Sequence, residues 1–361
     1  MPTHWFDAHL DLACAAALGR DMARSLAEAT GPWPPAAVTL PSLRDGQVTH
    51  ALPTIFTEAD GTDPGVSYPA GDAEAAHAAG LFQLDQYEKW EQAGLLTIHR
   101  PGAPAPTGPR LHCRFLMECA DPIREPSELP WWANRGVAVI GLAWGRGSRY
   151  AAGNSQDPAT DHGLTQMGRE LVAGMDAFGV VHDASHLSDR ALADLLEATD
   201  KPVIASHSNC RSIVARHPLT GEAIPESLRT HPDGARIALQ RHLTDDTIRE
   251  ISRRGAVIGL NLYSPFLIPG ALRSRRATIE ETVAHVEHIC SLVGHTRAVG
   301  LGSDMDGGFS AATLPDGINS PGDLPLLLDA LAQRGWTTED LDRFAWKNWL
   351  DFFAAVDARS R

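Results

Sequence analysis

The sequence predicts an α/β protein with the architecture of a TIM-type (β/α)8 barrel, and three observations favour this class. Short apolar runs rich in Val, Ile and Leu recur along the 361 residues. Helical patterns separate several of these runs, which is typical of parallel strands joined by crossover helices. The runs number eight, as the strands of this barrel do. A doubly wound open sheet stays an alternative, because periodicity does not distinguish it from a closed barrel.

Each apolar run is expected to form one strand, and helix-start signals lie between the later strands. Ser188 and Thr244 each precede a helical pattern, and Thr278 with Glu281 three residues later forms a capping box. These signals place helices after the fifth, sixth and seventh runs. The eight expected strands are residues 4–12, 48–57, 111–118, 136–144, 179–186, 202–207, 255–263 and 298–304.

Long loops are expected at three places within the barrel. Residues 60–75 and 100–110 are rich in Gly and Pro, and residues 211–240 form an extended segment. Strand signals continue on both sides of these segments, and the chain has no internal repeat. We therefore expect residues 1–361 to form one catalytic domain.

Composition excludes several classes of protein. Apolar residues make up 43% and charged residues 21% of the chain, as in globular proteins. The formal net charge of −14 repels polyanions, so a small molecule is a better candidate partner than a nucleic acid. The first 21 residues do not resemble a signal peptide, and no stretch approaches about 20 apolar residues. We expect a soluble cytoplasmic protein that does not bind membranes.

The cysteines do not predict a disulfide framework or a thiolate zinc site. They are five in number, widely scattered, and form no C-x-x-C pair. The 16 histidines are more informative, because some of them end the predicted strands.

Polar side chains gather where the expected strands end, which is where a barrel carries its catalytic groups. His9 and Asp11 end the first run, and strand periodicity places both side chains on one face. Together they offer one nitrogen and one oxygen ligand to a single ion. The other such residues are Glu118, His186, His207 and Asp304, at the ends of the third, fifth, sixth and eighth runs.

These residues predict a site for two divalent metal ions. His186 and His207 end consecutive runs and can share a second ion, with Glu118 bridging the two. Each histidine alone is more often structural, but five candidate ligands at strand ends favour a metal site. Imidazole and carboxylate ligands are those of catalytic zinc, although manganese and cobalt accept the same set.

A catalytic role is expected for Asp304. Two neighbouring metal ions would generate a shared hydroxide at neutral pH, which attacks a polarised carbonyl. Asp304 would then accept the proton of the water and deliver it to the leaving amine. The alternative is a turn or helix N-cap aspartate, which the following Asp306 and Gly307 also fit.

At this point the sequence resembles the membrane (renal) dipeptidase family, including its soluble bacterial members. The resemblance covers nearly the whole chain and rests on motifs in family order: FDAHLDL, MECADP, VVHDASHLSD, PVIASHSN, RHLTDD, AVGLGSDMDG and WKNWLDFF. It implies a zinc-dependent hydrolase of dipeptides with a (β/α)8 fold. The family's membrane forms carry a C-terminal lipid-anchor signal, whereas this chain ends in FFAAVDARSR, so no anchor is expected.

The resemblance also assigns roles to individual residues. His9, Asp11 and the bridging Glu118 match the ligands of the first metal, and His186 and His207 match those of the second. Asp304 matches the acid/base residue and Arg241 the arginine that grips the substrate's carboxylate, for which a guanidinium fork is suited.

Two departures from the family lie on the substrate side. Trp144 stands where the family commonly has histidine, and an indole donates one hydrogen bond but carries no proton. The long segment before Arg241 is the second departure. With Tyr263, which ends the seventh run, Arg241 and Trp144 are the expected substrate-binding residues. Arg211, Arg216 or Arg236 could replace Arg241, and Arg146, Arg149 or His162 could compensate for Trp144.

The function expected from the sequence is hydrolysis of a dipeptide by a hydroxide bridging two zinc ions. A first alternative is the same site acting on another small amide, a lactone or an N-acyl amino acid, because Trp144 changes the pocket. A second is a barrel that binds a ligand without turnover. A homodimer through the helix faces is compatible with the sequence.

Overall fold

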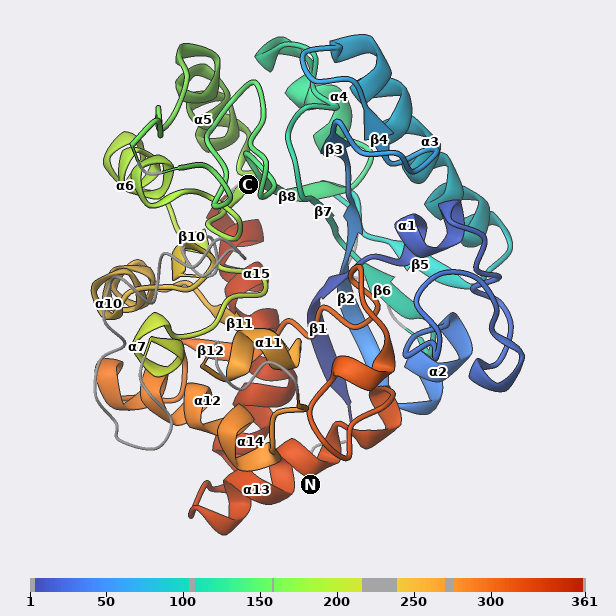
Figure 1. Ribbon diagram of the computed structural model, residues 1–361, viewed down its shortest axis with the longest axis vertical. Helices are drawn as coiled ribbons and strands as arrows, with labels where there is room; N and C mark the ends of the chain where they lie inside the picture. Colours follow the sequence, from blue (N-terminus) through green and yellow to red (C-terminus); the bar gives the residue numbers. More distant parts are fainter. Residues whose placement is uncertain (1–3, 104–107, 158, 216–238, 270–274, 360–361) are drawn as a thin grey trace.

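The computed structural model describes residues 4–103, 108–157, 159–215, 239–269 and 275–359, and a ring of parallel strands forms its centre (Figure 1). The strand order is β10-β9-β8-β7-β2-β1-β12-β11, with every neighbouring pair parallel. The strands are β1 (Trp5–Leu10), β2 (Val48–Ile55), β7 (Phe115–Met117), β8 (Val137–Gly141), β9 (Val181–Asp183), β10 (Val203–Ile204), β11 (Ile258–Leu260) and β12 (Val299–Leu301).

The two ends of this strand order meet at a seam between β10 and β11. Ala205 forms a parallel bridge with Ile258, and the amide of Gly259 donates to the carbonyl of Ala205 at 2.7 Å. The amide of Ser208 donates to the carbonyl of Gly259 at 2.9 Å. The predicted barrel is therefore confirmed, and the open doubly wound sheet was the wrong alternative.

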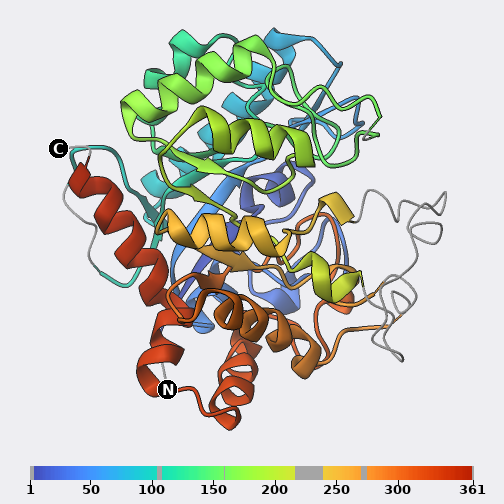
Figure 2. The same cartoon turned by 90° about the vertical axis from the view of Figure 1, so that its left-hand side faces the viewer.

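Helices surround the strands, as Figures 1 and 2 show from two directions. Their starts follow the predicted caps: the hydroxyls of Ser188, Thr244 and Thr278 accept from backbone amides in the first turns of α6, α10 and α12. The capping box of Thr278 and Glu281 is present. The α-helices are α1 (Leu12–Ala17), α2 (Leu40–Asp45), α3 (Ala73–Gln92), α4 (Leu129–Ala133), α5 (Gln166–Phe178), α6 (Asp189–Ala198), α7 (Arg211–Val214), α10 (Asp245–Arg253), α11 (Ser264–Leu267), α12 (Ile279–Val293), α13 (Pro325–Gln333), α14 (Thr338–Asp342) and α15 (Asn348–Arg359).

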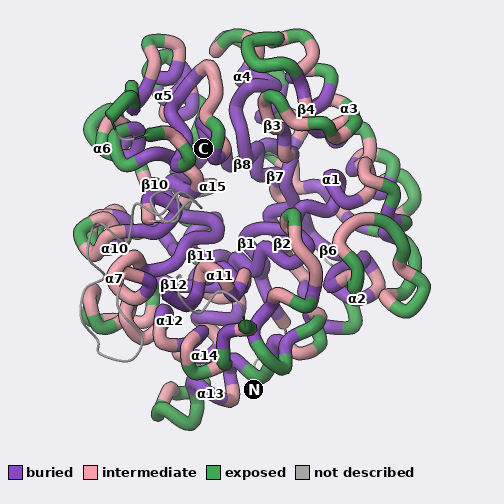
Figure 3. Tube along the Cα trace, in the orientation of Figure 1, coloured by how far each residue is buried: buried purple, intermediate pink, exposed green. Residues whose placement is uncertain are grey.

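The last helix packs across one end of the barrel. In Figure 2, α15 lies on the far left. Phe6 of β1 stacks on Trp349 and Phe353 of this helix at 5.9 and 5.8 Å, and the Trp349 indole donates to the carbonyl of Leu301 at 2.9 Å. These aromatic contacts close the end of the barrel that lies away from the strand carboxyl ends. Figure 3 shows buried residues concentrated along the strands, with exposed residues on the outer helices.

The structure contains short strands that the sequence did not predict. β3 (Glu58–Ala59) pairs with β4 (Ser67–Tyr68), and α3 begins at Ala73, so the expected loop over residues 60–75 is partly regular. β5 (Leu96–Ile98) pairs with β6 (Leu111–Cys113). The expected third strand is divided into β6 and β7 on either side of Arg114. Segments of two or three residues are too short to show periodicity.

The two other expected loops lie partly outside the described residues. In the expected loop over 100–110, residues 104–107 lie outside the described residues, as do residues 216–238 of the 211–240 segment, whose start forms α7. All five cysteines are free. Among the helices of the described ranges, none combines the length and the hydropathy needed to cross a membrane.

Candidate active site

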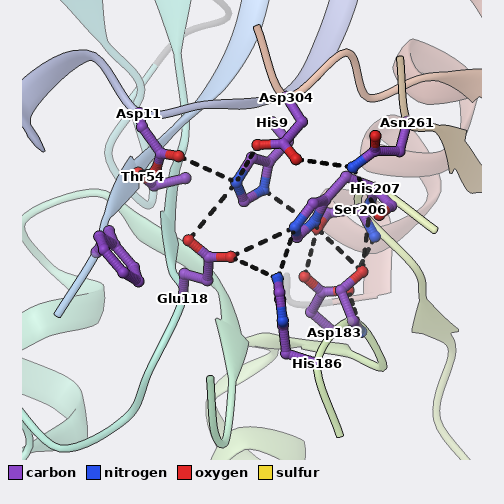
Figure 4. A network of polar contacts seen from close by, with 12 residues as sticks. His9, Asp11, Thr54, Glu118, Asp183, His186, Ser206, His207, Asn261 and Asp304 are labelled. Carbon is purple, nitrogen blue, oxygen red and sulfur yellow. Dashed lines mark hydrogen bonds and ion pairs between the residues drawn. The ribbon is translucent and has the colours of Figure 1, made fainter. Parts of the chain in front are cut away.

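Six of the residues predicted from strand ends converge in one place at the carboxyl ends of the strands, as Figure 4 shows. Five of them line a cavity of about 390 Å³, and the sixth, His9, has its Nε2 atom within 3.8 Å of three of these five. All are buried except His186, which is partly buried. The six are His9, Asp11, Glu118, His186, His207 and Asp304.

The first group of ligand atoms lies around His9. Its Nε2 atom is 3.6 Å from Glu118 Oε2, 3.7 Å from Asp11 Oδ2 and 3.8 Å from Asp304 Oδ1. This buried nitrogen has no hydrogen-bond partner. The Thr54 hydroxyl donates to the other oxygen of Asp11, which leaves Oδ2 facing His9. One atom each from His9, Asp11 and Glu118 could hold a single ion.

The second group lies around the other oxygen of Glu118. Glu118 Oε1 is 3.1 Å from His186 Nε2 and 3.3 Å from His207 Nε2. The two Nε2 atoms are 3.0 Å apart. The carboxylate of Glu118 thus presents one oxygen to each group, and the second group could also hold an ion.

Hydrogen bonds behind the two histidines determine their tautomers. The Ser206 hydroxyl donates to Asp183 Oδ2 at 2.5 Å, so it accepts from His207 Nδ1 at 2.7 Å. The Asn154 amide oxygen accepts from His186 Nδ1 at 3.2 Å. Each ring therefore carries its proton on Nδ1 and points an unprotonated Nε2 at the cavity.

Two unprotonated nitrogens and a carboxylate oxygen cannot stabilise one another at 3.0–3.3 Å. With Glu118 ionised, all three atoms present lone pairs, and no donor lies among them. A cation placed among them would convert this repulsion into coordination, and neutral imidazole with carboxylate is a ligand set that divalent zinc accepts. The residues present therefore fit the metal that the sequence predicts.

The electrostatics of the cavity also favour positive charge. Burial opposes protonation of His9, but the carboxylates of Glu118 and Asp11 raise its pKa to about 10. Burial, together with the neighbouring Asp11, raises the pKa of Asp304 to about 7. For Glu118, burial and the carboxylates of Asp11 and Asp304 raise the pKa well above the usual range. Glu118 and Asp304 thus bind protons more readily than usual, and a bound cation would displace these protons.

The pKa values of His186 and His207 are shifted in the opposite direction from those of His9, Asp304 and Glu118. Burial, with the positive charges of Arg241 and His9 nearby, lowers the pKa of both imidazoles well below the usual value. They are neutral at physiological pH, which is the form that binds metals.

Asp304 lies in a turn, but its side chain faces the cavity. Its backbone carbonyl accepts from Gly307, and its φ of 59° lies in the left-handed region that is rare outside glycine. Asn261 donates to Asp304 Oδ2 at 2.7 Å. A Cβ atom on Gly307 would lie 1.8 Å from Asp304 Oδ1, so glycine is required for this approach. The turn that was the alternative expectation for Asp304 is therefore present, and the Oδ1 atom of Asp304 still faces the other candidate ligands.

Asp306 supports the structure rather than the cavity. Its carboxylate accepts from the amides of Ala37 and Val38 and pairs with the buried Arg20. The turn after β12 is in this way attached to the loop that precedes α2.

The predicted substrate-side residues Trp144 and Tyr263 line the cavity. The Trp144 ring lies 5.8 Å from His186 and edge-on to Phe56 at 5.4 Å. Tyr263 stacks on Phe309 at 4.3 Å. The two predicted residues thus belong to separate aromatic walls.

Arg241 is buried behind His207. Its guanidinium donates to the His207 carbonyl at 2.7 Å and to Ser208 Oγ at 2.9 Å, and lies over the ring of Phe266. Its Nε atom has no hydrogen-bond partner. Arg241 therefore positions the backbone of a candidate ligand and adds positive charge to that side of the cavity.

The residues expected as substitutes for Arg241 and Trp144 lie elsewhere or are not described. Arg211 pairs with Asp189, and Arg149 binds Asp121 and nearby carbonyls. Arg146 donates to the carbonyls of Ala59 and Asp60. His162 is exposed, and Arg216 and Arg236 lie outside the described residues.

Sequence reasoning did not assign the residues that orient three of the six, Asp304, His186 and His207. Asn261 binds Asp304, Asn154 binds His186, and Asp183 with Ser206 binds His207. A signal was present for Asn261, because it interrupts the otherwise apolar run GAVIGLNLY. Asn154 lies in an irregular loop, where no such signal exists.

A model of a known protein family matches nearly all of this chain, and individual relatives match part of it. The family model of membrane dipeptidases (peptidase family M19) matches residues 2–226 and 228–361. An uncharacterised Klebsiella pneumoniae protein from the pqqA 5′ region is 29% identical over 60% of this chain and 70% of its own. A dipeptidase of Schizosaccharomyces pombe, described as uncharacterised, is 27% identical over 62% of this chain and 47% of its own. This chain thus spans about half the length of that relative.

Solved structures share the fold. A dipeptidase of family M19 superposes with a TM-score of 0.77 at 23% identity, covering 100% of this chain and 99% of its own. A metallopeptidase from Rhodobacter sphaeroides, bound to a phosphinate mimic of L-Ala-D-Ala, gives 0.77 at 22% identity with both chains fully covered. The family match over nearly all residues confirms the resemblance found in the sequence, and the chain belongs to the membrane dipeptidase family of metallopeptidases.

Proposed function

We propose that the protein hydrolyses dipeptides in this cavity with two divalent metal ions, zinc being the ion that the ligand set suits best. One observation carries the proposal: the two oxygens of Glu118 face two separate groups of nitrogen and carboxylate atoms. A carboxylate shared between two groups is the arrangement that a two-metal hydrolase needs.

His9, Asp11 and Glu118 would hold one ion, and Glu118, His186 and His207 the other. Such ions would lower the pKa of water, so that hydroxide is available at neutral pH, and would polarise a carbonyl oxygen. Residues of the chain itself would perform the remaining steps of the reaction, the proton transfers.

Asp304 is the proposed carrier of the proton. Its Oδ1 atom lies 3.8 Å from His9 Nε2, within the group of candidate ligands. Asn261 binds the other oxygen and fixes the orientation of the carboxyl group. Asp304 thus accepts the proton of the attacking water and delivers it to the amine that leaves.

The cavity supports a small substrate. Its volume of about 390 Å³ is within the range of sites for small molecules. The Rhodobacter neighbour binds a dipeptide mimic. Arg241, buried behind His207, adds positive charge to that side of the cavity and attracts a substrate carboxylate. Trp144 and Tyr263 line the cavity and supply apolar contact.

The test is metal content together with turnover of a dipeptide panel. We expect about two zinc ions per chain and hydrolysis of L,L or L,D dipeptides. Glu118→Gln should lose at least one ion and about a thousandfold or more in kcat, whereas Glu197→Gln on the exposed side of α6 should match the unaltered protein. A protein without metal after loading would contradict the proposal. Turnover-free binding of dipeptides by the metal-loaded protein would support a non-catalytic barrel.

A second candidate function rests on Trp144, whose ring lies beside His186. An indole there cannot carry a proton toward the substrate, and this favours another small amide, a lactone or an N-acyl amino acid. Trp144→His should raise dipeptide turnover if the ring is what limits it. Preference of the unaltered protein for non-peptide amides over dipeptides would favour the second candidate.

A further inference from the structure

The cavity carries more negative charge than the candidate metal ligands require. Among the described residues that line it, five are carboxylates and none is lysine or arginine. Asp11, Glu118 and Asp304 belong to the site already described. Glu58 and Asp63 remain, and both also line the cavity.

Glu58 and Asp63 lie near to each other on the β2 side. Glu58 begins β3, which follows β2, and its Oε1 accepts from the Ser67 hydroxyl at 3.3 Å. The same hydroxyl accepts from the backbone amide of Asp63 at 3.0 Å. Both carboxylates also act on the thiol of the buried Cys14, whose pKa is raised well above its usual value by burial and by four nearby carboxylates.

Among the described residues, these two carboxylates have one ion pair, between Glu58 and Arg146. Arg146 is half-exposed, and its Nε lies 4.0 Å from Glu58 Oε2 while its Nη1 binds loop carbonyls. The Asp63 carboxylate has no hydrogen-bond or ion-pair partner among the residues that the structure describes. A second observation marks this cavity as a ligand site: three of the carboxylates that line it lie 3.6–3.8 Å from the buried Nε2 of His9, which has no hydrogen-bond partner.

Aromatic rings accompany the carboxylates. Phe56 and Trp144 form an edge-on pair at 5.4 Å, and Trp33 also lines the cavity. Aromatic faces attract cations and accept the alkyl stem of a long side chain. Carboxylates with aromatic rings suit a lysine or arginine side chain better than a neutral or acidic one.

Positive charge lies on the opposite side of the barrel. β10 is four strands from β2 in both directions around the ring, and Arg241 binds His207 and Ser208 just after β10. In Figure 1, β3 and α10 accordingly lie on opposite sides of the barrel axis. A dipeptide would place its carboxylate toward Arg241, because Glu58 and Asp63 repel it, and its amino-terminal residue toward β3.

We propose that Glu58 and Asp63 select dipeptides whose amino-terminal residue carries a cationic side chain. The inference rests on the proposed dipeptidase function and adds the substrate class. The α-ammonium group is common to all dipeptides, so the selection concerns the side chain.

The experiment compares L-Lys-L-Ala with L-norleucyl-L-Ala and L-Glu-L-Ala, using the zinc-loaded protein. Norleucine retains the length of lysine and the α-ammonium group but lacks the side-chain charge. We expect kcat/KM to be about tenfold higher for the lysine substrate than for norleucine, and lowest for glutamate. Glu58→Gln and Asp63→Asn should each reduce the lysine-to-norleucine ratio by about fivefold, as for partly exposed ion pairs.

Asp85→Asn is the matched control, because Asp85 is exposed on α3 and lies outside the cavity. It removes one negative charge and should leave the ratio unchanged. Where a cavity variant does not fold, salt gives a second measurement on the unaltered protein: the ratio should fall as ionic strength rises, because partly exposed charges are screened.

The outcomes separate the two proposals. Equal rates for lysine and norleucine substrates, or a ratio indifferent to the variants and to salt, would overturn the charge selection and leave the dipeptidase proposal intact. Absence of hydrolysis of all three dipeptides and of neutral ones, with metal bound, would overturn both.

Discussion

Two groups of histidines occupy opposite ends of the same barrel. His9, His186 and His207 lie at the carboxyl ends of the strands, around the carboxylate of Glu118. His50 lies near the start of β2, stacked on Phe6 at 5.9 Å and 4.9 Å from the ring of His112. The first group lies among acidic side chains, whereas the second lies among the rings of phenylalanine and histidine side chains.

The surroundings of these histidines shift the pKa of the imidazole in opposite directions. Carboxylates overcome burial and raise the pKa of His9 to about 10. Burial, followed by the charges of His112, His4 and Arg114, lowers the pKa of His50 to about 4. The comparison teaches that the number of histidines does not indicate a metal site, whereas their position at strand carboxyl ends does.

The largest expected effect separates the two groups directly. His207→Ala should lose one metal ion and about a thousandfold in kcat, because it removes a proposed ligand. His112→Ala should retain both ions and kcat within about threefold, because it lies at the other end of the barrel. Metal analysis and steady-state kinetics measure both. Equal losses in the two variants would contradict the comparison.

The next effect concerns the support behind a ligand. Asp183→Asn weakens the acceptor for Ser206, whose hydroxyl fixes the tautomer of His207. We expect zinc affinity to fall about 10- to 100-fold, measured by competition with a chelator. Asp189→Asn, at an exposed position in the first turn of α6, is the control. Unchanged affinity would show that the Nδ1 contact does not orient His207.

The smallest effect is on stability at low pH. The pKa of His50 is lowered to about 4 in the folded protein, against about 6.5 when unfolded. The unfolded state therefore binds more protons between these values, so stability is full above pH 6.5 and falls as the pH decreases toward 4.

His50→Phe removes this contribution and retains a ring against Phe6. Between pH 7 and pH 4.5, urea unfolding should show a loss of stability about 1 to 2 kcal/mol smaller in this variant than in the unaltered protein. An identical loss in both proteins would mean that His50 is not held neutral by the fold.

Much of the fold and of the candidate site was predictable, because both follow from periodicity. Eight apolar runs correspond to the eight barrel strands, and a residue at the end of a run, such as Glu118, lies at the carboxyl end of a strand. Parallel strands bring their ends together, so residues far apart in sequence could be grouped without a structure.

The remaining features depend on contacts that no local pattern reports. Asn261 was not assigned because its partner Asp304 comes from another strand. Glu58 lies on a strand of two residues, which is too short for periodicity. Arg241 was expected to grip a substrate, a role that stays a prediction, and its hydrogen bonds to His207 and Ser208 could not be read from sequence.

The proposed metal ions would also stabilise the barrel at the seam between β10 and β11. Strand β10 has only two residues, and side chains supplement its pairing: Asn209 donates to the carbonyl of Asn261, and Arg241 binds the carbonyl of His207. His207 follows this weakly paired strand, whereas Glu118 follows the well-paired β7. An ion bound by both His207 and Glu118 would hold the ends of β10 and β7 together across the barrel. Metal removal should therefore loosen the seam first, with faster amide exchange at residues 205–210 than in β1 or β2.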